Sequence, residues 1–122
     1  MKRPIKFRGQ REDTKEWVYG SLIEDKYIVG NVIDWNEDYF NTEYWWKVIP
    51  KTVGQFTGLL SQDKQDIYEG DRLFDYDDDY YVVEFSEGRF VAVGDGFEVD
   101  LFEIADRCSV IGNIHDNKEL MK

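Results

Sequence analysis

Apolar and polar residues alternate with a period of two along much of the chain, which is the pattern of half-buried β-strands. The first such stretch is IKFRG at 5–9, where Ile5 and Phe7 alternate with Lys6 and Arg8. Further runs rich in β-branched and aromatic residues are WVYGSLIE (17–24), KYIVGNVID (26–34), YYVVEF (80–85), RFVAV (89–93) and SVIGNI (109–114). Helical spacing is scarce, so the sequence predicts a mainly β fold.

Short polar segments between these runs predict tight turns. Glu24 and Asp25 separate two of the runs and are expected to form a hairpin tip. SEG at 86–88 predicts a three-residue hairpin loop in which Gly88 supplies a positive φ. GDG at 94–96 is expected to turn another hairpin.

The segment VGQFTGLLSQDKQDIYEGDRLF (53–74) contains a further turn. Gly70 is expected to adopt a left-handed backbone conformation, and the Asp71 carboxylate to accept hydrogen bonds from amides freed by that turn. Small SH3-like barrels often enter a strand through a similar turn. We therefore predict a three-stranded meander from Ile67 to Val93 that belongs to a small barrel or half-barrel.

Two regions are harder to assign. FEVDLFEIADR (97–107) suits both a helix and a strand, and we favour a strand or irregular edge. Asp116 or Asn117 could cap a short helix at the end of the chain. The predicted fold class is mainly β, a small SH3-like or related β-barrel or meander with additional N-terminal strands and a short C-terminal helix.

The chain has 122 residues, which is a common size for one domain, so we predict a single domain over 1–122. Its one cysteine, Cys108, cannot form an internal disulfide, which favours a reducing, cytoplasmic location. No run of about 18 apolar residues occurs and the N-terminus lacks the apolar core of a signal peptide, so neither membrane insertion nor export is expected.

Charge is unevenly distributed. The chain has 26 acidic and 15 basic residues, a net charge of −11. Residues 1–15 hold six basic and two acidic groups, a local +4, so the remainder carries −15. This acidic body repels polyanions, and direct nucleic-acid binding is not expected. The basic segment is either a solvated first strand or a dock for an acidic face of a neighbouring copy.

The run DYDDDYYVVEFSE (75–87) places Asp75, Asp77 and Asp79 at the first, third and fifth positions of a calcium-loop pattern. The pattern then fails, because Tyr80 replaces the required glycine and Ser86 the final glutamate. We predict a solvated acidic turn and no metal site.

Cys108 and the only histidine, His115, are seven positions apart, which directs them to opposite faces of one strand. A nucleophile–base pair would need a bulge between them, for example at Gly112. We therefore expect Cys108 in the core or at an edge and His115 at the surface. No glycine-rich phosphate loop is present. The sequence predicts no catalytic, cofactor-binding or metal-binding residues, no cofactor, and no enzyme.

Aromatic residues concentrate in YFNTEYWW (39–46), where five rings occur within eight residues, more than one strand face can bury. With one neighbouring tryptophan they form the candidate interaction set: Trp35, Tyr39, Phe40, Tyr44, Trp45 and Trp46. These rings are either rigid anchors for a partner or second protomer, or a cap on an open end of the barrel.

The blocks IKFRG, VYG (18–20), VGQFTGL (53–59), IYEGDRL (67–73) and VIGNIHDNKEL (110–120) occur in the order found in the YopX family. The chain resembles this family of small proteins encoded by phages and prophages across almost its whole length. The resemblance implies a single YopX-like domain, a mobile-element origin in a bacterial host cell, self-association, and no known catalytic residue. The chain departs most from the family at 34–47.

These observations favour a non-enzymatic interaction module that forms a homo-oligomer and can engage a host or phage protein. The alternative is an acidic mimic of DNA that occupies a host nucleic-acid-binding protein, because carboxylates held in register can replace phosphates. A small hydrolase is a third class and would need a deep pocket that joins His115 to two carboxylates.

Overall fold

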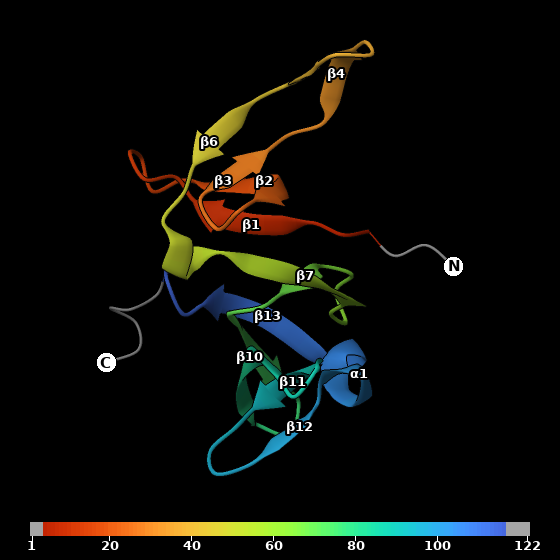
Figure 1. Cartoon of the computed structure of the whole chain (residues 1–122). Coiled ribbons are helices and arrows are strands. Elements are labelled where there is room, and N and C mark those ends of the chain that lie inside the picture. Colours follow the sequence, from red (N-terminus) through yellow and green to blue (C-terminus); the bar gives the residue numbers. More distant parts are fainter. Residues whose placement is uncertain (1–3, 117–122) are drawn as a thin grey trace. The chain divides into compact units, whose positions relative to one another are not determined.

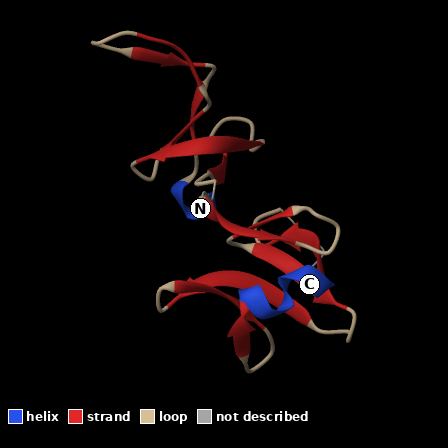
Figure 2. Cartoon of the chain, turned by 90° about the vertical axis from the view of Figure 1, so that its right-hand side faces the viewer, coloured by secondary structure: helices blue, strands red, loops and turns tan. Residues whose placement is uncertain are grey.

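A computed structural model describes residues 4–116. Contacts group the chain into two compact units, Met1–Gln55 (unit 1) and Phe56–Lys122 (unit 2). Antiparallel strands make up most of each unit and the helices are short (Figure 2). The prediction of a mainly β fold is therefore confirmed.

Unit 1 is built on antiparallel strands in the order β6-β3-β2-β1. Their bounds are β1 (Phe7–Gln10), β2 (Trp17–Ile23), β3 (Tyr27–Val29) and β6 (Trp45–Lys47), and a 3-10 turn, η1 (Pro50–Thr52), follows. The first two residues of β7 (Gly54–Leu60) pair with β1. The predicted strand at 17–24 and the turn at Glu24 and Asp25 are confirmed. The strand predicted over 5–9 begins only at Phe7, and Ile5 lies outside it and is exposed.

The single strand predicted over 26–34 is wrong. β3 ends at Val29, and after Gly30 and Asn31 the chain continues as β4 (Val32–Trp35), which pairs with β5 (Phe40–Thr42). The β3–β6 register extends into this hairpin, since the Gly30 amide donates to the Tyr44 carbonyl at 2.9 Å and Val32 lies opposite Thr42, and the register shifts only between Val32 and Asp34. In Figure 1 this hairpin projects beyond β2 and β3.

Unit 2 contains a five-stranded antiparallel sheet in the order β12-β11-β10-β9-β13. The bounds are β9 (Asp71–Asp75), β10 (Tyr80–Ser86), β11 (Arg89–Val93), β12 (Glu98–Asp100) and β13 (Cys108–Asn113); β8 (Asp66–Tyr68) pairs with β7. The predicted meander is confirmed in β9, β10 and β11. Within residues 4–116 the sheet does not close into a barrel, because its edge strands β12 and β13 are not paired with each other.

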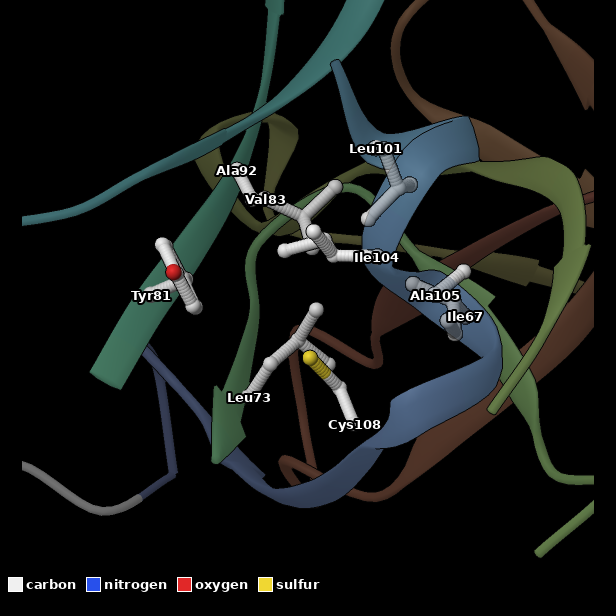
Figure 3. Close-up of a cluster of buried hydrophobic side chains, with 9 residues drawn as sticks. All are labelled: Ile67, Leu73, Tyr81, Val83, Ala92, Leu101, Ile104, Ala105 and Cys108. Carbon is white, nitrogen blue, oxygen red and sulfur yellow. The ribbon is translucent and has the colours of Figure 1, made fainter. Parts of the chain in front are cut away.

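The core of unit 2 lies between this sheet and a short helix, α1 (Leu101–Ile104). Nine buried side chains form it: Ile67, Leu73, Tyr81, Val83, Ala92, Leu101, Ile104, Ala105 and Cys108. Figure 3 shows these side chains converging from the strands and from α1. This cluster supplies the apolar burial that stabilises the unit.

The strand or irregular edge favoured over 97–107 is right only for β12. The chain then forms α1 and a 3-10 turn, η2 (Ala105–Arg107). The Asp100 side chain caps α1 by accepting from the Phe102 amide at 3.1 Å, and Leu101 and Ile104 reach the core from one face. The helix predicted at the chain end falls mainly outside the described residues, and 114–116 form a turn.

Two turns depend on glycine as expected. Gly70 has φ +93°, and the buried Asp71 carboxylate accepts from the Tyr68 amide at 2.7 Å. In the β10–β11 hairpin Glu87 and Gly88 both have positive φ, and Ser86 pairs with Arg89. The positive φ of Gly88 is confirmed, but the loop has two residues instead of three because this turn type matches the twist of the strands.

Candidate functional site

Residues 30–44 form a two-stranded extension of unit 1, which we call the arm. Its strands are joined by backbone hydrogen bonds at its base, from the Glu43 amide to the Asn31 carbonyl at 2.8 Å. At its tip, the Asn36 side chain accepts from the amides of Asp38 at 2.7 Å and Tyr39 at 3.1 Å. These contacts explain why a sequence with few turn glycines still reverses direction here.

The arm exposes large apolar side chains. Trp35 is 74% exposed, Tyr39 54% and Phe40 59%. Val32 and Ile33 on β4 are exposed to a similar degree, at 53% and 64%. So many large apolar side chains exposed on one short hairpin are typical of an interaction site rather than of a solvated loop. The alternative that these rings cap a barrel loses its basis, because the described strands form no closed barrel.

The other three candidate residues lie at the base of the arm and differ in role. Tyr44 is half-buried, and its hydroxyl donates to the Tyr19 carbonyl at 2.6 Å. Trp46 lies under the guanidinium of Arg11, 3.5 Å from the ring centroid. Both therefore stabilise unit 1 itself.

Trp45 remains 63% exposed and packs edge-on against Tyr27, with ring centroids 5.8 Å apart. It belongs to an open groove of about 610 Å³ at the base of the arm. The lining residues are Ile23, Tyr27, Val29, Phe40, Asn41, Thr42 and Trp45. The sequence analysis missed Ile23, Tyr27 and Val29, although their alternation along two neighbouring strands could have indicated a shared apolar face.

The basic N-terminal segment is not simply a solvated strand. Arg8 is buried and its guanidinium lies 4.8 Å from the Trp17 ring centroid. Arg11 forms ion pairs with Asp13 at 2.9 Å and Glu16 at 3.6 Å. The hydrogen bond from Arg11 holds the pKa of the exposed Asp13 carboxyl below its ordinary value. These cations thus contribute to the structure of unit 1.

The acidic run of unit 2 is solvated except at its first member. Asp77, Asp78 and Asp79 are exposed, whereas Asp75 is buried and accepts from Arg107 Nε at 3.1 Å. This hydrogen bond raises the pKa of Arg107. The predicted solvated turn is therefore wrong for Asp75. Among residues 4–116 no group of three or more histidine, cysteine or acidic side chains is arranged to hold a metal ion.

Cys108 lies in the core, as predicted, with no exposed surface. Its burial, with Asp75 nearby, raises the pKa of the thiol to about 11. β13 does contain a bulge between Val110 and Gly112, but a buried protonated thiol is a poor nucleophile. His115, expected at the surface, is half-buried, and its amide donates to Asn113 Oδ1 at 2.8 Å.

Comparison with known proteins agrees with this architecture of open antiparallel sheets. The model of the family described as YopX protein matches residues 6–122, and the chain belongs to the YopX family. This confirms the resemblance carried by the five sequence blocks. No curated protein matches the chain.

A solved structure supports the fold. The crystal structure of protein EF1440 from Enterococcus faecalis is similar with a TM-score of 0.70 and 23% sequence identity, and the match covers 99% of this chain and 100% of that one. At this identity the similarity establishes the fold. In the part of the chain that the structure describes, no helix is both long and apolar enough to span a membrane.

Proposed function

We propose that the protein is a non-enzymatic, self-associating interaction module whose arm is the contact surface. The observation that carries the proposal is the exposure of Trp35, Tyr39 and Phe40 on a hairpin in which every residue from 31 to 41 is exposed. A two-stranded hairpin is marginally stable in water, so a partner that covers these rings would stabilise the folded arm. Aromatic anchors of this kind dominate binding energy at interfaces.

The charge distribution supports contact through unit 1. Unit 1 has nine basic and nine acidic residues and is neutral, whereas unit 2 has six basic and 17 acidic residues, a charge of −11. Contact between two neutral units carries no net like-charge repulsion, whereas contact between two acidic units does. The same arm could engage a phage or bacterial host protein, and a free buried thiol suits the reducing cytoplasm of such a host.

Light scattering over a concentration series tests this function. We expect the unmodified protein to show a mass above that of the monomer. In the double variant Trp35→Ser with Tyr39→Ser, the dissociation constant of the oligomer should rise at least tenfold, so that the monomer predominates. The matched control is Phe102→Ser, which removes a ring that is equally exposed at 74% but lies on α1. Equal masses for the arm variant and the control would reject the arm as the contact surface.

A second candidate function is an acidic mimic of DNA, favoured by the concentration of the whole net charge in unit 2. Carboxylates of this unit would occupy the basic groove of a host nucleic-acid-binding protein. Such a mimic should release labelled DNA from that protein in a competition assay, with strong dependence on salt. Retention of DNA at saturating concentrations of this chain would reject it.

A further inference from the structure

The groove and the arm belong to the same unit and have complementary properties. One wall of the groove is a face of β2, β3 and β6, because Ile23 pairs with Tyr27 and Val29 pairs with Trp45 in direct opposition. Residues 40–42 at the base of the arm complete its lining. Ile23 is 46% and Trp45 63% exposed, so this apolar face is uncovered in a single copy. Unit 1 thus presents both a projecting apolar ridge and an open apolar groove.

The arm and the rest of unit 1 carry opposite charge. The arm contains four acidic residues and no basic one: Asp34, Glu37, Asp38 and Glu43. Unit 1 outside the arm has nine basic and five acidic residues, a charge of +4. Lys47 lies on the groove face directly opposite Tyr27, and its pair with Glu12 is long, at 3.8 Å, with both side chains more than half exposed. An acidic arm that enters this face meets a favourable field.

The dimensions of the two surfaces are compatible. Seven residues from Gly30 to Asn36 extend about 20 Å at the rise of a β-strand. The three strands that carry the groove are roughly 10–15 Å wide at normal strand spacing. A second arm can therefore cross the whole groove and bring its tip to the far strand.

The area that could be covered is that of a stable dimer. Phe40 lines the groove of its own copy, so the surface that an arm can bring to a partner is that of Trp35, Tyr39 and Ile33. These side chains are 74%, 54% and 64% exposed and supply roughly 350 Å² per arm. If each arm covers an equal area of groove, two such contacts bury roughly 1,400 Å², within the range of about 1,200–2,000 Å² for stable interfaces.

Resting on the proposed function, we infer that the partner of the arm is a second copy of this chain and that the exchange is reciprocal. The arm of each copy lies in the groove of the other, so that Trp35 and Tyr39 contact the partner's Ile23 and the partner's Tyr27. A two-fold interface requires this reciprocity, since residue i meets residue j in both directions. Both surfaces of unit 1 are covered in one step.

Complementation between two variants tests the inference. The arm variant carries Trp35→Ser and Tyr39→Ser, and the groove variant carries Ile23→Ser and Trp45→Ser; circular dichroism and thermal unfolding check their folding. Each damages both contacts of its own homodimer, and we expect each alone to be monomeric. Mixed in equal amounts, they can form a heterodimer with one intact contact, so native mass spectrometry should detect a mixed dimer.

The outcomes separate this inference from the proposed function. If the arm variant is monomeric but the mixture forms no mixed dimer, the arm mediates association without entering the groove, and only the inference fails. If the unmodified chain is monomeric at all concentrations, or binds solely a different protein, self-association fails as well. Phe102→Ser should retain the unmodified dimer in every experiment.

Disulfide trapping gives a measurement that does not depend on the serine variants. We pair Glu37→Cys at the arm tip with Ser21→Cys, which lies opposite Val29 on the groove face; Cys108 is buried and can stay in place. Oxidation of the mixture should yield a mixed dimer in at least fivefold excess over either self-linked dimer. Predominant linkage of Glu37→Cys to itself would indicate arm-to-arm contact and overturn the inference.

Discussion

The two units carry equal numbers of aromatic residues but differ in how many of them they bury. Each has ten. Unit 2 buries Phe56, Tyr68 and Tyr81 and gathers nine side chains into one cluster, whereas Ile28 and Val48 are the fully buried apolar side chains of unit 1 among residues 4–55. Unit 2 thus obtains its stability from an internal core, while unit 1 buries few large apolar side chains completely.

The two units also differ in net charge and in tryptophan content. The whole net charge resides in unit 2, while all four tryptophans reside in unit 1 and none of them is buried. A strongly charged unit keeps copies apart, and a neutral aromatic unit can bring them together. This distribution supports the proposal that copies associate through unit 1.

The largest expected effect distinguishes the core from the arm. Leu73→Ala should lower the free energy of unfolding by about 3 kcal/mol, because a fully buried leucine leaves a cavity. Trp35→Ala removes a larger side chain and should change it by about 0.5 kcal/mol or less in monomeric protein, since that ring is exposed. Urea unfolding measures both. Equal losses would show that the arm is part of a folded core.

A smaller loss is expected at the turn that leads into β9. Asp71→Ala should cost about 2 kcal/mol, because the buried Tyr68 amide loses its charged acceptor at 2.7 Å. The matched control is Asp95→Ala, which removes an exposed carboxylate from another turn of unit 2. If both variants unfold at the same urea concentration, the side chain of Asp71 has no role in the turn.

Burial of the Cys108 thiol should make the stability of the folded protein depend on pH. Its pKa is raised in the folded state to about 11, so the unfolded chain ionises first and stability falls as pH rises from about 9 to 11. Below this window the contribution is fully present. Cys108→Ala should lack this part of the pH dependence, as measured by unfolding at successive pH values.

Thiol labelling gives a second test of this burial. At pH 8 a thiol reagent should react with the native protein at least tenfold more slowly than with the protein unfolded in urea. Rapid labelling of the native protein would contradict the burial of Cys108.

The smallest expected effect concerns the base of the arm. Arg11→Ala should destabilise by about 1 kcal/mol, because it removes the cation stacked on Trp46 together with two exposed ion pairs. Tryptophan emission should shift to longer wavelength as Trp46 gains water. Arg89→Ala, which breaks one exposed pair with Glu98 at 3.7 Å, is the control. An unchanged emission spectrum would show that the stacking is not maintained in solution.

Local patterns predicted the strands and turns of the molecule because alternation and positive φ are short-range properties. The β10–β11 hairpin and the Gly70–Asp71 turn both followed from a few neighbouring residues. The split between β3 and β4 did not, because KYIVGNVID reads as one run, and nothing in it marks the break at Gly30 and Asn31 or the register shift after Val32. Helix α1 was missed because four residues carry too little periodicity to outweigh a strand pattern.

The candidate site was predicted in part. The density of rings at 39–46 pointed to the arm, and Trp35, Tyr39, Phe40 and Trp45 are indeed exposed. Composition could not assign Tyr44 to a hydrogen bond with Tyr19, since that contact spans 25 positions in sequence. Nor could it find the groove, which arises only when β2, β3 and β6 pair side by side.

Hydrogen exchange of the arm amides measures whether association covers the arm. We predict that amides of residues 31–41 are protected at protein concentrations above the association midpoint and exchange at least tenfold faster below it, because the hairpin is marginal without a partner. Amides of β10 and β11 should stay equally protected at both concentrations. Arm amides that exchange at the same rate at both concentrations would contradict the claim that this surface is covered by association.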